Sequence, residues 1–183
     1  MFRDSVQTFV GGVPVILNRI SFSGELGYEV YCRPQYLLAL SYYDQIDDVG
    51  RDQGLTYQAL QGLREVIEKY PDSEYASSAI LKFDLAFDHL AAKEMEIGRY
   101  YLKRGNYTAA INRFRTVVQD FQTTTHTAEA LHRLVEAYLS LGITAEARTS
   151  AAVLAYNFPG SEWYQASYAR LQGEGLAPWE DEE

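Results

Sequence analysis

An internal repeat constrains the fold of this chain more than any other feature of its sequence. Gly105 and Gly142 lie 37 residues apart, and the same shift superposes three further pairs: Tyr101 on Tyr138, Ala110 on Ala147 and Val117 on Leu154. In a repeat built from two helices, a small residue on the second helix lets the first pack closely, and glycine suits a helix end. The extra residues relative to the usual period of ~34 fall in the polar turn Thr123–Thr127. The pattern therefore predicts stacked helical hairpins.

A third copy of the repeat lies upstream, at an offset of 51 residues. Ala59 corresponds to Ala110, and Leu63 corresponds to Phe114. This interval is longer by 14 residues, close to four turns at ~3.6 residues per turn, so the insertion preserves the inward face. We therefore predict one long helix from about residue 74 to 104, roughly 46 Å long at ~1.5 Å per residue. The predicted fold class is mainly α: a tetratricopeptide-like solenoid of helical hairpins that share this helix.

The sequence pattern changes character near Pro34. Before it, Val13–Phe22 is rich in β-branched and aromatic residues, and Tyr28–Tyr31 alternates as the return strand of a β-hairpin would. After it, apolar residues recur every three or four positions nearly to residue 172. We therefore predict three parts: a β-rich fragment over 1–35, a helical scaffold domain over 36–174 and an acidic tail over 175–183.

Charge and hydropathy exclude several classes of function. The net charge is −9, whereas nucleic-acid binding needs a basic face, so no nucleic-acid partner is predicted. No stretch approaches the ~18 apolar residues of a membrane span, and no secretory signal is visible. Cys32 is the only cysteine, which excludes an intrachain disulfide. The sequence therefore predicts a soluble chain, cytoplasmic or without a recognisable targeting signal.

Residues that could carry catalysis or bind a metal do not form a recognisable pattern. Of the three histidines, only His126 and His132 are close in sequence, and their spacing across a turn is not typical of metal ligands. A lone strand cysteine such as Cys32 is usually inert. We therefore predict no catalytic residue, no metal site and no cofactor.

Binding of another protein is the function that a stack of helical hairpins serves best, because it forms a concave surface suited to peptides or domains. Basic residues around the first full repeat stand out against the acidic background, and we predict that five of them contact a partner: Arg99, Arg104, Arg113, Arg115 and Arg133. A run of surface charge is more often a solvated face, so both interpretations stay open.

Several motifs of the helical part occur in the order typical of one family: Ser41–Ile46, Lys93–Tyr101, Ala110–Phe114 and Asn157–Tyr164. From about Tyr36 to Leu171 the chain resembles the BamD/ComL family of outer-membrane assembly lipoproteins. The resemblance implies a non-enzymatic tetratricopeptide fold on the periplasmic side of the outer membrane, with the C-terminal repeats docking onto a periplasmic domain of BamA. The family's signal peptide, lipidated cysteine and first repeats have no counterpart in this sequence, so anchoring is not carried over.

The N-terminal segment resembles a different family. Arg19–Glu29 is similar to a motif of the aminomethyltransferase fold, found in the glycine cleavage T-protein and in dimethylglycine and sarcosine dehydrogenases. The resemblance implies that Glu25 contacts the pteridine of folate. We therefore hypothesise a chimeric chain, and we keep two alternatives to the docking scaffold: a folate-dependent methylene-transfer enzyme with accessory helices, and a generic tetratricopeptide adaptor. The sequence does not decide whether residues 1–35 fold.

Overall fold

The computed structural model describes residues 5–10, 13–22, 25–31, 34–48, 53–73 and 75–176. The chain divides into two compact units, Met1–Ala86 and Phe87–Glu183. The boundary falls inside one long helix, and each unit has its own buried core.

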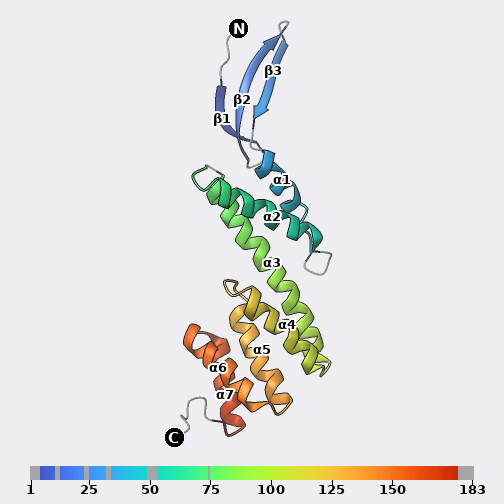
Figure 1. Ribbon diagram of the computed structural model, residues 1–183, viewed down its shortest axis with the longest axis vertical. Coiled ribbons are helices and arrows are strands. Elements are labelled where there is room, and N and C mark those ends of the chain that lie inside the picture. Colours follow the sequence, from blue (N-terminus) through green and yellow to red (C-terminus); the bar gives the residue numbers. More distant parts are fainter. Residues whose placement is uncertain are drawn as a thin grey trace. The chain divides into compact units, whose positions relative to one another are not determined.

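The first unit begins with three strands: β1 (Ser5–Val10), β2 (Val13–Phe22) and β3 (Glu25–Tyr31). They form one antiparallel sheet in the order β1-β2-β3, with Val10 opposite Val13 and Phe22 opposite Glu25 (Figure 1). The sequence pattern predicted a single hairpin here, whereas the structure has a third strand, β1. A six-residue strand carries too short an alternation to stand out in the sequence.

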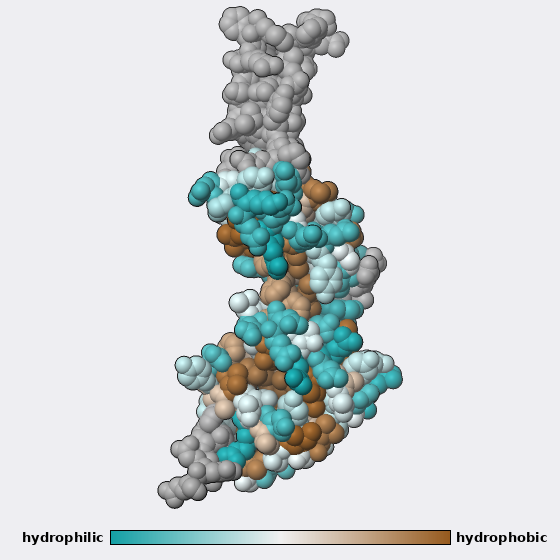
Figure 2. All heavy atoms as spheres, in the orientation of Figure 1, coloured by the Kyte–Doolittle hydropathy of each residue, from teal (hydrophilic) through white to brown (hydrophobic). Residues whose placement is uncertain are grey.

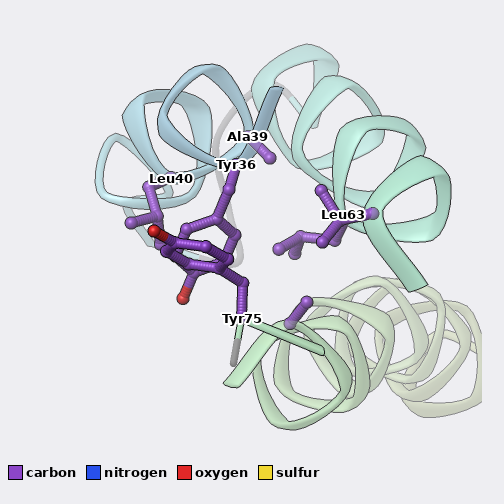
Figure 3. Close-up of a cluster of buried hydrophobic side chains, with 7 residues drawn as sticks. Tyr36, Ala39, Leu40, Leu63 and Tyr75 are labelled. Carbon is purple, nitrogen blue, oxygen red and sulfur yellow. The ribbon is translucent and has the colours of Figure 1, made fainter. Parts of the chain in front are cut away.

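Three helices complete the first unit: α1 (Pro34–Tyr43), α2 (Gly54–Lys69) and the first part of α3 (Ala76–Lys103). Their buried core gathers Tyr36 and Ala39 from α1, Leu63 from α2, and Tyr75 beside α3 (Figure 3). The ring centroids of the two tyrosines lie 5.0 Å apart, and the Tyr36 hydroxyl donates a hydrogen bond to the Ser78 hydroxyl at 2.7 Å. The contacts hold α1 against the start of α3.

The second unit contains the end of α3 and four further helices: α4 (Tyr107–Asp120), α5 (Thr127–Ser140), α6 (Thr144–Asn157) and α7 (Glu162–Gly173). Helix α5 packs against α4, α6 and α7. One core cluster joins Val135 of α5, Ala147 of α6 and Leu171 of α7. The mainly helical, tetratricopeptide-like fold that the repeat predicted is confirmed.

The long helix is also confirmed, since α3 runs without interruption over 28 residues. None of the described helices combines the length and the apolar character needed to cross a lipid bilayer.

Three helix ends repeat the same geometry. Gly105, Gly142 and Gly175 follow the ends of α3, α5 and α7 with φ of 72°, 74° and 72°, a left-handed conformation that glycine adopts without strain. After each glycine, the next N–H donates to a carbonyl five residues back: Asn106 to Tyr101 at 3.0 Å, Ile143 to Tyr138 at 2.9 Å and Leu176 to Leu171 at 2.9 Å. The first two members of the set are the glycines on which the repeat was recognised.

Candidate protein-interaction surface

A network of ion pairs joins three helices of the second unit. Two bonds connect Arg99 of α3 with Glu129 of α5, one of them from Nε to Oε1 at 2.9 Å. Glu129 also accepts from Arg133 Nε, one turn further along α5, at 3.3 Å. Because both arginines converge on one carboxylate, α3 and α5 are fixed in register.

The same network continues from α5 to α7. Arg133 Nη1 donates to Glu136 at 2.9 Å, and Arg170 of α7 donates to the other oxygen of Glu136 at 2.9 Å. Charges therefore alternate along the path from Arg99 to Arg170, and each carboxylate accepts hydrogen bonds from two arginines. We call these five residues the ion-pair ladder: Arg99, Glu129, Arg133, Glu136 and Arg170.

Both glutamates of the ladder have a lowered pKa. Burial raises the pKa of Glu129, whose side chain is only 12% exposed, but the hydrogen bond and charge of Arg99 and the charge of Arg133 outweigh it. Burial acts in the same way on Glu136, and there the hydrogen bond from Arg133 and the charge of Arg170 lower the pKa. The carboxylates are therefore charged at neutral pH, and the ladder is complete.

A buried polar pair lies beside the ladder. His132 of α5 shares a hydrogen bond of 2.8 Å between its Nδ1 and the hydroxyl of Ser167 on α7, and both residues are buried. The imidazole also lies 5.4 Å from the ring of Trp163, over which Arg133 is placed at 5.4 Å. Burial, and then the charge of Arg133, lower the pKa of His132, so the ring is neutral at neutral pH.

The five arginines predicted from sequence fall into two groups. Arg99 and Arg133 belong to the ladder, and Arg113 of α4 donates to Glu94 of α3 at 3.1 Å. The guanidinium of Arg104 instead lies over the ring of Tyr100, with 4.6 Å between Cζ and the ring centroid. Arg115 is exposed on α4. Among the described residues, neither Arg104 nor Arg115 forms a salt bridge.

The sequence interpretation missed the carboxylates that accept these bonds, and it missed Arg170. Glu129 and Arg133 are four residues apart, and Arg133 and Glu136 are three apart, which are spacings that place charges together on one helix. This signal was available in the sequence. The pairing of Arg99 with Glu129 spans 30 residues and depends on which faces of α3 and α5 meet.

Hydrophilic and hydrophobic residues share the described surface (Figure 2). On the face drawn in Figure 2, hydrophilic residues cover much of the described surface, with hydrophobic ones between them. Exposed large hydrophobic side chains of the second unit include Leu141, Ile143, Val153 and Tyr156. A polar surface with separate apolar contacts is typical of interfaces between proteins that also exist apart.

The sequence predicts no metal site, and the resemblance of its first segment implies a folate contact at Glu25. Among the described residues, no group of three or more His, Cys, Asp or Glu side chains is arranged to hold a metal ion. Glu25 begins β3, but its side chain lies outside the part that the structure describes.

The chain is similar in sequence to known proteins over most of its length. The sequence model of the YfiO family, an outer membrane lipoprotein, matches residues 29–154. The chain is 55% identical over 143 residues to the outer membrane protein assembly factor BamD of Caulobacter vibrioides, which covers 78% of this chain and 47% of that protein. It is 52% identical over 133 residues to the BamD protein of Rickettsia prowazekii, covering 73% of this chain and 53% of the relative. The chain thus spans about half the length of the curated relatives it matches.

Proposed function

Because this chain belongs to the YfiO family of outer membrane lipoproteins, we propose that it is a non-catalytic scaffold of the machinery that assembles outer membrane proteins. The observation that carries the proposal is the 55% identity over 143 residues to a BamD assembly factor. The scaffold acts on the periplasmic side of the outer membrane, and it docks onto the periplasmic region of a BamA-like protein.

The geometry of the second unit supports a role in docking. The ion-pair ladder fixes α3, α5 and α7 without a moving part or a reactive group, so these helices present a constant surface. Rigid surfaces bind with less loss of conformational entropy than flexible ones. Of the five predicted arginines, Arg104 and Arg115 contact the partner directly, whereas Arg99, Arg113 and Arg133 act by holding helices in place.

Binding to a purified BamA periplasmic region tests this function. We expect the full chain to bind the immobilised region in biolayer interferometry, and we expect the double variant Arg104→Glu/Arg115→Glu to bind at least about tenfold more weakly, because like charges at an interface repel. The matched control is Lys69→Glu, a charge reversal at an exposed position of α2 in the other unit. Absence of binding by the unchanged chain would favour the generic tetratricopeptide adaptor.

A folate-dependent methylene-transfer activity remains the competing proposal, and it rests on the residues Arg19–Glu29. The YfiO match begins at residue 29, so it leaves most of that motif uncovered. Isothermal titration with tetrahydrofolate separates the two functions. Micromolar binding that Glu25→Gln abolishes would favour the enzyme and the chimeric origin, and a flat titration would leave the scaffold.

A further inference from the structure

The end of α3 carries an arginine whose surroundings differ from those of its neighbours. Arg104 is exposed and lies over Tyr100, one helical turn earlier, with its Cζ 4.6 Å from the ring centroid. Tyr100 is itself 51% exposed, and its ring meets that of Tyr101 edge-on at 5.6 Å between centroids. The Tyr100 ring therefore supports the guanidinium from one side, while the Arg104 side chain as a whole is exposed.

Four other arginines of the second unit use their N–H groups within the chain. Arg99, Arg113, Arg133 and Arg170 each donate to a glutamate. Arg104 has no such acceptor among the described residues, although a guanidinium carries five N–H donors in a planar fork. The ring beneath it satisfies the charge in part but accepts none of these hydrogen bonds in the guanidinium plane.

Stacking prepares this arginine to bind a carboxylate. An arginine on a helix surface normally loses side-chain entropy when it is fixed by a partner, but stacking on Tyr100 already restricts it. The fork geometry matches a carboxylate with two parallel hydrogen bonds. Arginine and tyrosine are also the residue types that contribute most of the binding energy at protein interfaces.

Local charge favours an acidic ligand at this position. Lys103 and Arg104 are adjacent, exposed and basic, in a chain whose net charge is −9. A long polyanion would be repelled by the rest of the chain, whereas a short acidic segment needs only this local basic end. Helix α3 ends at Lys103, so Arg104 lies in the turn that Gly105 and Asn106 continue.

We propose that the stacked pair Tyr100–Arg104 is the contact point for an acidic segment of a partner protein, with Arg104 receiving a glutamate or aspartate carboxylate in a bidentate ion pair. This inference rests on the proposed function, because it names the chemistry that the docking partner presents. No covalent step is involved, and the partner carboxylate stays ionised.

A peptide titration tests the proposal without any partner protein. The probe is a fluorescein-labelled peptide of six glutamates, its binding is followed by fluorescence anisotropy, and a peptide of six glutamines is the reference. We expect saturable binding of the glutamate peptide only, weakened about tenfold by Arg104→Ala. Tyr100→Leu should weaken binding about two- to fivefold, and Tyr100→Phe should leave it unchanged, because phenylalanine retains the ring.

Lys103→Ala is the matched control, since it removes the same charge from the same helix end without touching the stacked pair. Equal losses for Lys103→Ala and Arg104→Ala would overturn the proposal, because charge alone would then explain binding. Tighter binding to phosphatidylglycerol vesicles than to the peptide would also overturn it in favour of a lipid surface. Far-UV circular dichroism of each variant verifies the fold. The BamA-binding experiment can fail while this one succeeds, so the two proposals are distinguishable.

Discussion

Gly98 shows how one missing side chain positions two helices. A Cβ added at this position of α3 would lie 2.5 Å from the ring of Phe114, which is completely buried in α4. The ring is buried and can shift only by displacing its neighbours, so overpacking by ~1–3 kcal/mol outweighs the gain of up to ~1 kcal/mol in helix propensity. We expect Gly98→Ala to lower the free energy of unfolding in urea by about 1–2 kcal/mol. Gly173→Ala, where a Cβ meets nothing within 4 Å, is the control and should not destabilise.

The two glutamates of the ladder make the stability of the fold decrease at low pH. Their pKa is lower in the folded state than the ordinary 4.5, so the unfolded chain binds protons first as pH falls. The stabilisation is complete above pH ~4.5 and is lost as pH falls through the folded pKa. We expect the melting temperature to fall steeply below that pH. Glu129→Gln should lower it at pH 7 and flatten its dependence on acid; an equally steep profile in the variant would contradict the ladder's role.

His132 makes the free energy of unfolding depend on pH in a second, higher range. Its pKa is lowered by burial and by Arg133, while Glu136 and Glu129 raise it and Arg170 lowers it further. A base with a lowered pKa stabilises the fold fully above its unfolded value of about 6.5, and this stabilisation is lost as pH falls below it. We expect a decline in unfolding free energy between pH 7 and 5 that His132→Gln removes. Titration of the imidazole by NMR measures the pKa directly.

At the scale of elements, α7 closes the helical stack of the second unit. Leu171 is completely buried against Val135 and Ala147, and Leu176 packs on the same cluster after the glycine turn. Removing such a side chain creates a cavity and costs ~2–4 kcal/mol. We expect Leu171→Ala to destabilise by that amount and to accelerate amide exchange in α7 more than in α4. Val153→Ala on α6, where the side chain is 39% exposed, should cost less than ~0.5 kcal/mol.

Elements built from local pattern could be predicted from the sequence. The extent of α3 followed from a repeat interval lengthened by whole turns, and the ends of α3 and α5 followed from their glycines. The third glycine turn, at Gly175, was not recognised as a repeat of the others, because the residues around it are less similar and α7 is followed by an acidic tail. The tail beyond residue 176 lies outside the described part of the chain.

The candidate site was less predictable than the fold, and for a physical reason. The five arginines were chosen by the sign of their charge, which says nothing of the acceptors that other helices bring to them. Arg99 finds Glu129 and Arg113 finds Glu94 only after α3 packs against α5 and α4. Arg104 differs from the other four arginines in a way that the sequence alone can show, because Tyr100 precedes it by one helical turn.

At the scale of the whole molecule, truncation tests whether the proposed scaffold domain of residues 36–174 folds without residues 1–35. The described core of the first unit is built from Tyr36 onward, with α1, α2 and the start of α3 contributing its side chains. We therefore expect a chain shortened to residues 36–183 to retain the far-UV circular dichroism of its helices, to melt within ~4 °C of the full chain and to bind the BamA region with unchanged affinity. For a chain of this size, a shift of ~4 °C corresponds to about 1–2 kcal/mol.

Comparing the full chain with the shortened chain also separates the two proposed functions, the docking scaffold and the folate-dependent enzyme. A scaffold that docks through α3 and α4 retains its binding when the sheet is removed, whereas a folate site on Glu25 is lost with it. Limited proteolysis supplies the independent measurement, with cleavage near residues 30–36 expected to leave a stable helical product. A shortened chain that loses its helical signal would instead make the sheet part of the same folding unit, because the helices would then depend on it for their core.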